Sequence, residues 1–252
     1  MKKWGSETFE FAPIGHVKSP FPDKFGVPRQ PGLATGAKGV LKIADDPDLK
    51  TALRSLEEFS HLWIVFVFHE HGGKNWKPSI RPPRLGGNRK VGVLASRSPH
   101  RPNPIGISAV VIEKVDLEAG GGPEIHVGGI DLIDGTPILD IKPYIPYADA
   151  IPGAKAGWAS EPIPRTPISF TEAADREVGA FDPDGVKNFR SLIIEVLELD
   201  PRPAYQQRQL PVTNPEAWGT RYGFELLGRD VKYEIREDGF WVLGIGDPPA
   251  RR

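Results

Sequence analysis

The segment HLWIVFVFH, from His61 to His69, is a nearly continuous run of aliphatic and aromatic residues. Its length suits a strand, and such a run predicts a buried central strand. Other short β-rich segments precede and follow it, at 9–18, 39–43, 91–95, 107–115, 124–133 and 137–142. Because many short strands follow one another with few helices, we predict a mainly β N-terminal domain over residues 1–150, as a closed or partly closed barrel.

The rest of the chain has a different pattern. We expect one helix inside the barrel domain, over 45–59, capped by Asp45 or Asp46. Residues 151–167 are rich in Pro, Gly and Ala and lack apolar periodicity, which predicts a linker. Residues 168–252 are expected to form a smaller α+β domain, with helices over 171–181 and 185–199 and strands over 224–227, 231–235 and 240–245.

Composition excludes several classes of protein. The chain has 252 residues and no cysteine, so disulfides, thiolate metal sites and cysteine nucleophiles are absent. No apolar run approaches the about 20 residues of a membrane span, and no signal peptide is apparent, so we expect a cytoplasmic protein without membrane contact. A Walker A motif, a GxGxxG loop after a strand and a GxSxG elbow are also missing.

The charge is unevenly distributed although the net charge is only −1. Residues 72–112 contain no Asp or Glu but many Lys and Arg, so this tract favours an anionic ligand such as phosphate. The alternative is a solvated basic loop balanced by acidic neighbours in space. Next to the tract, His69 and His71 would share one face of a strand, but no third metal ligand has suitable spacing, and no metal is expected.

Several loops combine prolines with polar side chains. The central loop, Arg97–Gly106 (RSPHRPNPIG), is stiffened by three prolines, and Gly106 permits a close backbone approach. A rigid loop of this kind suits a phosphate or a base edge. Asp200–Tyr205 (DPRPAY, hereafter the DPRPAY segment) pairs arginine and tyrosine in the way that single-stranded RNA is held, although a simple helix stop is the alternative.

These motifs together are similar to a known family. SHLWIVFVFHEH (60–71), SRSPHRPNPIGIS (96–108), IDLIDGTPILDIKPYIPYAD (130–149), PRQPG (28–32) and DPRPAY resemble the TsaA/TrmO/YaeB family, the last in its two-domain bacterial members. The resemblance implies a β-barrel that binds S-adenosylmethionine unlike the Rossmann methyltransferases. It also implies a homodimer with the cofactor near the subunit interface, and N6-methylation of threonylcarbamoyladenosine at position 37 of tRNA.

Site residues follow from the resemblance, motif by motif. The expected cofactor contacts are Pro28, Arg29, Gln30, His69, Glu70, Arg97, Ile107, Asp134, Gly135 and Thr136. The expected contacts with the tRNA anticodon loop are Arg101, Asn103, Tyr144, Arg202 and Tyr205. A general base is not identified: His69, Glu70 and Asp134 are candidates by residue type only. Two alternatives stay open, namely a non-catalytic RNA-binding β-barrel and a methyltransferase with a different acceptor.

Overall fold

The N-terminal half of the protein is a closed β-barrel. The computed structural model describes residues 7–71, 76–85 and 89–249. The barrel strands follow the order β1–β2–β7–β6–β3–β8, and all neighbouring pairs are antiparallel. Their bounds are Gly15–Lys18 (β1), Lys38–Ile43 (β2), His61–Val67 (β3), Ile105–Asp116 (β6), Glu124–Gly128 (β7) and Pro137–Pro143 (β8). The predicted mainly β barrel is therefore confirmed.

Strand β3 lies between β6 and β8, as a central strand should. Leu62, Ile64 and Phe66 point into the barrel core and are almost fully buried. The alternate residues Trp63 and Val65 are only half-buried, so this central strand is buried mainly on its interior face. In a small barrel the alternate side chains of a strand point to the interior and the exterior, and only the interior face joins the core.

Some predicted elements are shorter than expected. The helix over 45–59 is an α-helix α1 at Pro47–Ala52, capped by Asp46, and a separate 3-10 turn at Leu56–Glu58. Ser55 breaks it with a φ of 66°, which a helix does not allow. Strand 9–18 is reduced to β1, and strand 124–133 ends with β7. Segment 91–95 does not join the barrel: β5, Val91–Gly92, pairs with β4, Ser79–Ile80, in a separate ribbon.

The C-terminal part is a second sheet covered by helices, as predicted. The strand order is β10–β11–β12–β9, in which β9 is parallel to β12 and the other pairs are antiparallel. The strands are Ile168–Phe170 (β9), Arg221–Leu226 (β10), Arg229–Arg236 (β11) and Gly239–Gly246 (β12). The helices are Glu172–Phe181 (α3), Phe189–Leu197 (α4) and Ala204–Gln209 (α5), and a short α2 at Pro146–Asp149 follows the barrel.

Two elements of this second part were not predicted. Strand β9 lies at the end of the expected linker, where three residues give too little pattern to recognise. Helix α5 starts inside the DPRPAY segment, for which the sequence indicated an RNA contact or a helix stop rather than the start of a helix. Pro203 directly precedes the helix, and a proline is tolerated there because the first N–H groups of a helix have no partner within it.

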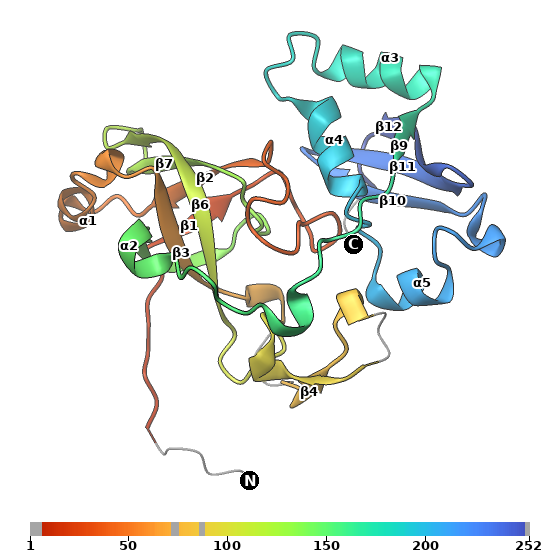
Figure 1. Ribbon diagram of the computed structural model, residues 1–252. Helices are drawn as coiled ribbons and strands as arrows, with labels where there is room; N and C mark the ends of the chain where they lie inside the picture. The colour runs from red at the N-terminus through yellow and green to blue at the C-terminus, as the bar shows by residue number, and fades with distance from the viewer. Residues whose placement is uncertain (1–6, 72–75, 86–88, 250–252) are drawn as a thin grey trace.

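The two parts contact each other through the long loop between β1 and β2, residues 19–37. This loop extends from the barrel to α4 (Figure 1). The carboxylate of Glu195 on α4 accepts hydrogen bonds from Thr35 Oγ1 and Gly36 N, both at 2.8 Å. Gly26, in the left-handed region, leaves no room for a Cβ beside the Phe224 ring. This loop carries the PRQPG motif, so the second domain helps to position that motif.

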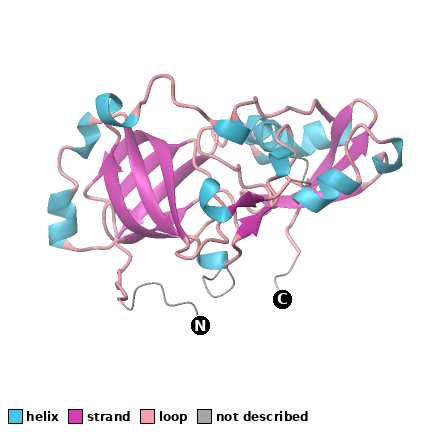
Figure 2. Ribbon diagram, turned by 60° about the horizontal axis from the view of Figure 1, so that its bottom comes forward, coloured by secondary structure: helices cyan, strands magenta, loops and turns pink. Residues whose placement is uncertain are grey.

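The barrel and the second sheet lie at opposite ends of the elongated molecule, with loops and short helices between them (Figure 2). Within the part of the chain that the structure describes, none of the helices is long and apolar enough to cross a membrane.

Candidate functional site

A large cavity opens where β3 ends and β6 begins. Its volume is about 1330 Å³. Its walls come from the PRQPG loop, the end of β3 with the following turn, the central loop, the start of β6, residues 131–133 and Thr136. The antiparallel pairing of Val67 with Ile105 brings the end of β3 to the start of β6, and Phe68 N donates to Pro104 O at 2.8 Å. We call this space the barrel cavity.

Most of the cofactor residues expected from the sequence surround the barrel cavity. They are Pro28, Arg29, Gln30, His69, Glu70, Arg97, Ile107 and Thr136. Asp134 and Gly135 do not line it. The Asp134 carboxylate instead accepts hydrogen bonds from Lys18 Nζ at 3.1 Å and Ser19 N at 2.9 Å, which ties the turn to the end of β1. The structure thus separates Thr136 from its two neighbours in sequence.

The central loop is held by its own hydrogen bonds. Ser96 Oγ accepts from Ser98 N, and Arg101 Nη1 donates to Ser96 O at 3.1 Å. Arg97 reaches outward, and its Nη1 donates to Gln30 Oε1 at 2.6 Å. This bond joins the two motifs with the strongest expected role in cofactor binding, across 67 residues of sequence.

A half-buried carboxyl group in the cavity wall was not among the site residues expected from the sequence. Asp131 accepts a hydrogen bond from the buried Ser108 hydroxyl at 2.6 Å. Burial raises the pKa of Asp131 to about 6, although the Ser108 hydrogen bond and the more distant Arg97 oppose this shift. None of the ion pairs between described residues involves Asp131. The sequence signal for Asp131 is its position: it is a charged residue directly after Gly129 and Ile130, which follow β7.

The His69-Glu70-His71 segment differs from its expected geometry. It forms a 3-10 turn after β3 rather than the end of the strand, so the two histidines do not share a strand face. His69 Nε2 lies 3.6 Å from Glu70 Oε1, whereas the His71 ring approaches His100 with 5.2 Å between ring centroids. Within the described ranges, no group of three or more His, Asp or Glu side chains is arranged to hold a metal ion.

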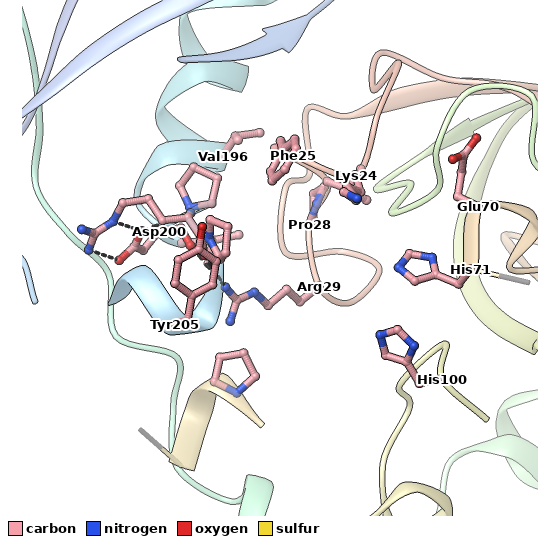
Figure 3. Close-up of a pocket in the computed structure, with 17 residues that line it drawn as sticks. Lys24, Phe25, Pro28, Arg29, Glu70, His71, His100, Val196, Asp200 and Tyr205 are labelled. Carbon is pink, nitrogen blue, oxygen red and sulfur yellow. Dashed lines mark hydrogen bonds and ion pairs between the residues drawn. The ribbon is translucent and has the colours of Figure 1, made fainter. Parts of the chain in front are cut away.

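A second cavity of about 710 Å³ lies between the two domains (Figure 3). Residues of the PRQPG loop, the His69–His71 turn, the central loop and the DPRPAY segment line this interdomain cavity. Arg29 spans it, and its Nη2 donates to the carbonyl oxygens of Asp200 at 3.4 Å and Arg202 at 3.3 Å. Arg29, Glu70, His71 and His100 line both cavities, so the two spaces adjoin each other.

Comparison with known sequences identifies both halves of the chain. Residues 16–150 match the profile described as the tRNA-methyltransferase O N-terminal domain, and residues 163–248 match the TrmO C-terminal domain. The chain belongs to the tRNA-methyltransferase O family. Among its relatives, the tRNA (adenine(37)-N6)-methyltransferase of Escherichia coli is 40% identical over 242 residues, which cover 94% of this chain and 98% of the relative.

Further relatives agree with this assignment to the tRNA-methyltransferase O family. A putative S-adenosylmethionine-dependent methyltransferase from Pseudomonas aeruginosa is 44% identical over 239 residues, covering 94% of this chain and 98% of that protein. The crystal structure of TrmO from Pseudomonas aeruginosa superposes with a TM-score of 0.73 at 36% identity, covering 95% of this chain and all of that one. The likeness therefore extends over both domains.

The expected tRNA contacts of this tRNA-methyltransferase O member are scattered. Arg101 lines the barrel cavity, and the half-exposed Tyr205 lines the interdomain cavity. Asn103 is exposed on the central loop but lines neither cavity. Tyr144 lies against His61 and Trp63, where β3 begins, and thus at the barrel end away from the cavity.

Arg202 has a structural environment. Its side chain is only 1% exposed and forms an ion pair with Asp200 through Nη2 at 2.7 Å and Nε at 2.8 Å. Nη1 donates to Leu210 O, and the guanidinium lies over the Tyr222 and Phe240 rings. Every face of the group is occupied by protein, so direct contact between Arg202 and a tRNA phosphate has no support in this arrangement.

Proposed function

We propose that this protein transfers the methyl group of S-adenosylmethionine to N6 of threonylcarbamoyladenosine at position 37 of tRNA. The observation that carries the proposal is the barrel cavity, where eight of the residues expected to contact the cofactor meet around one space. The similarity to the tRNA (adenine(37)-N6)-methyltransferase of Escherichia coli and to the putative S-adenosylmethionine-dependent methyltransferase of Pseudomonas aeruginosa supports the reaction class and the donor. The threonylcarbamoyl group comes from the family resemblance of the motifs.

The barrel cavity suits the chemistry of this donor. S-adenosylmethionine carries a sulfonium and an ammonium group, and the half-buried Asp131 carboxyl lacks an ion-pair partner among the described residues. Apolar side chains from β3, the central loop region and residue 132 offer a surface for adenine and the methylthio group. Arg97, fixed by Gln30, and the PRQPG backbone would orient the donor. The cofactor supplies an activated methyl group when bound.

The protein would contribute mostly alignment. An in-line transfer requires the acceptor nitrogen and the methyl carbon to lie within roughly 3–3.5 Å of each other. Rigid binding sites for both the donor and the acceptor favour this geometry. Of the acid–base candidates, Glu70 lines both cavities, whereas the Asp134 carboxylate is engaged by Lys18 and Ser19. We therefore place Glu70 nearest to the acceptor proton as the candidate base.

A homodimer is part of the proposal. The outer face of β6 exposes Ile105, Ile107 and Val111, and the adjoining outer face of β3 carries the half-buried Val65 and Val67. Contiguous apolar surface of this kind marks an interaction site. Ile105 and Ile107 also line the barrel cavity, which would place the donor beside the partner subunit. Light scattering of wild type and Ile107→Asp tests this, and a monomeric wild type would contradict it.

The test of the function uses the purified protein and two anticodon stem-loop RNAs, one with threonylcarbamoyladenosine and one with adenosine at position 37. We expect methyl transfer from labelled S-adenosylmethionine to the first RNA, with the product localised to N6 by mass spectrometry. Isothermal titration should detect donor binding without RNA. A non-catalytic RNA-binding barrel would bind RNA but not the donor, and a methyltransferase with a different acceptor would bind the donor but modify neither RNA.

A further inference from the structure

The charge of the interdomain cavity is not explained by the methyl donor. Lys24, Arg29, His71 and His100 line it, with Glu70 and Asp200 as the acidic residues. Asp200 forms the ion pair with Arg202, and Glu70 lies beside His69. None of the ion pairs between described residues gives Lys24, His71 or His100 a carboxylate partner. The cavity therefore has an excess of cationic and imidazole groups.

The two imidazoles are brought together by separate backbone segments. His71 N donates to Phe68 O at 3.2 Å, and His100 O accepts from Lys77 N at 3.0 Å, so both residues are fixed by hydrogen bonds. Their rings meet edge to face across the cavity wall (Figure 3). The residues are 29 positions apart in the sequence, and neither was selected as a site residue there.

The electrostatics of this pair favour an anion. Burial lowers the pKa of His71 first, and repulsion by His100, Lys24 and His69 adds to this, while Glu70 opposes it. Burial and Lys77 lower the pKa of His100. A bound oxyanion would offset the mutual repulsion and accept hydrogen bonds from both rings, which favours their protonated forms.

The position of the pair relates it to the reaction. His71, His100 and Arg29 line both cavities, so an anion held there would lie at the boundary with the barrel cavity. In Figure 3 the Arg29 side chain extends between the two histidines and Tyr205. Tyr205 is 53% exposed and free to present its ring to a base. The volume is also within the range of about 300–1,000 Å³ that small-ligand sites occupy.

We propose that the interdomain cavity is an acceptor subsite, in which His71, His100 and Lys24 hold an oxyanion of the substrate RNA, either a carboxylate or a phosphate, while Tyr205 stacks on a neighbouring base. The proposal rests on the methyltransferase function proposed above and assigns it a second subsite. The donor then occupies the barrel cavity beside Asp131, and the anionic group of the acceptor occupies the interdomain cavity, with the histidine pair at the boundary between the two.

The experiment measures the KM for the threonylcarbamoyladenosine stem-loop and the Kd for S-adenosylmethionine in wild type, His71→Gln and His100→Gln. His126→Gln is the matched control, because His126 lies on β7 and lines neither cavity. We expect each cavity variant to raise the KM by about tenfold, as for the loss of one charge-assisted hydrogen bond, with an unchanged donor Kd. Thermal unfolding of each variant checks that it is folded.

One further RNA, compared with the threonylcarbamoyladenosine stem-loop, identifies the source of the oxyanion. If it is the threonyl carboxylate, an RNA with a neutral amide in its place has a raised KM that the histidine variants do not raise further. If it is a phosphate, the variants lose about tenfold on both RNAs, and the salt dependence of binding becomes shallower by about one counterion.

Other outcomes overturn the subsite. A KM within twofold of wild type in both variants rejects it, and so does an equal loss of donor affinity, which would assign the histidines to the cofactor. If the wild-type protein methylates none of the RNAs, the function proposed above fails. RNA binding measured by fluorescence anisotropy then decides the subsite separately: about tenfold weaker binding in the variants supports it, and equal binding rejects it.

Discussion

The central loop and the DPRPAY segment share a sequence pattern but have opposite environments. Each is a run of prolines around an arginine that we expected to contact a ligand. Arg97 is exposed at the barrel cavity and bonded to Gln30, whereas Arg202 is buried and bonded to Asp200 and Leu210. Prolines fix the backbone of both segments, but the neighbouring acceptors decide where the guanidinium points. One arginine is therefore available to a ligand, and the other holds the domain together.

The largest expected effect separates these two roles. Arg202→Ala removes the partner of the mostly buried Asp200 carboxylate and leaves Leu210 O without its donor. We expect a loss of about 3–5 kcal/mol in the free energy of unfolding, since breaking a buried pair leaves an uncompensated charge. Urea denaturation measures it. The exposed Arg176→Ala on α3 is the control, with a change within about 0.5 kcal/mol.

This outcome revises the expectation from sequence that Arg202→Ala acts mainly on tRNA binding. A variant with wild-type stability and weakened tRNA affinity would restore the original expectation. It would also mean that the buried guanidinium becomes accessible when RNA binds.

The second prediction concerns the exit of the central loop into β6. A Cβ on Gly106 would lie 2.3 Å from the Phe66 ring, so Gly106→Ala must displace a core side chain. We expect a loss of about 1–3 kcal/mol in stability, as for overpacking of a core, together with weaker donor binding because Phe66 lines the barrel cavity. Gly92→Ala is the matched control, because nothing lies within 4 Å of its added Cβ. Equal stability of the two variants would contradict the close packing.

The third prediction tests the ligand-facing arginine. Arg97→Ala should leave stability within about 0.5 kcal/mol of wild type, because the side chain is exposed. Its donor affinity should fall by about tenfold, the loss expected for one hydrogen bond to a charged group. Isothermal titration measures the donor affinity of this variant and of Gln30→Ala. If the two positions act through their mutual hydrogen bond, the double variant should lose less than the sum of the single losses. Unchanged donor affinity in Arg97→Ala would show that Arg97 does not contact the donor.

Sequence patterns predicted the architecture well because it depends on local periodicity and turns. The barrel, the α+β second part and the existence of the central strand β3 follow from residues close together in the chain. The histidine pair and the Asp131–Ser108 contact depend instead on strand closure and on packing between distant segments. The environments of Arg202 and Asp134 could not be predicted, because their hydrogen-bond partners, Leu210 O and Lys18, cannot be identified before the fold is known.

The smallest expected effect concerns Asp131 and depends on pH. Its pKa is raised from 3.8 to about 6 in the folded protein. Between these values the folded state holds a proton that the unfolded state has lost, so stability falls as the pH rises through this window. Above about pH 6 the ionised carboxylate destabilises the donor-free protein fully. Asp131→Asn should therefore raise stability by about 1 kcal/mol at pH 7.5, allowing for the part of the side chain that water reaches, and change it little below pH 4.

Donor binding should respond to Asp131→Asn in the opposite direction. In wild type, the affinity for the cationic donor should increase as the pH rises through about 6, because the carboxylate then becomes ionised. In the variant this increase should disappear, so the donor binds more weakly at pH 7.5 although the free protein is more stable. Parallel pH series of chemical denaturation and donor titration measure the two effects. The same pH dependence in both proteins would show that the charge of Asp131 does not serve the donor, and the two cavities would no longer differ in the charge of the ligand each is built to hold.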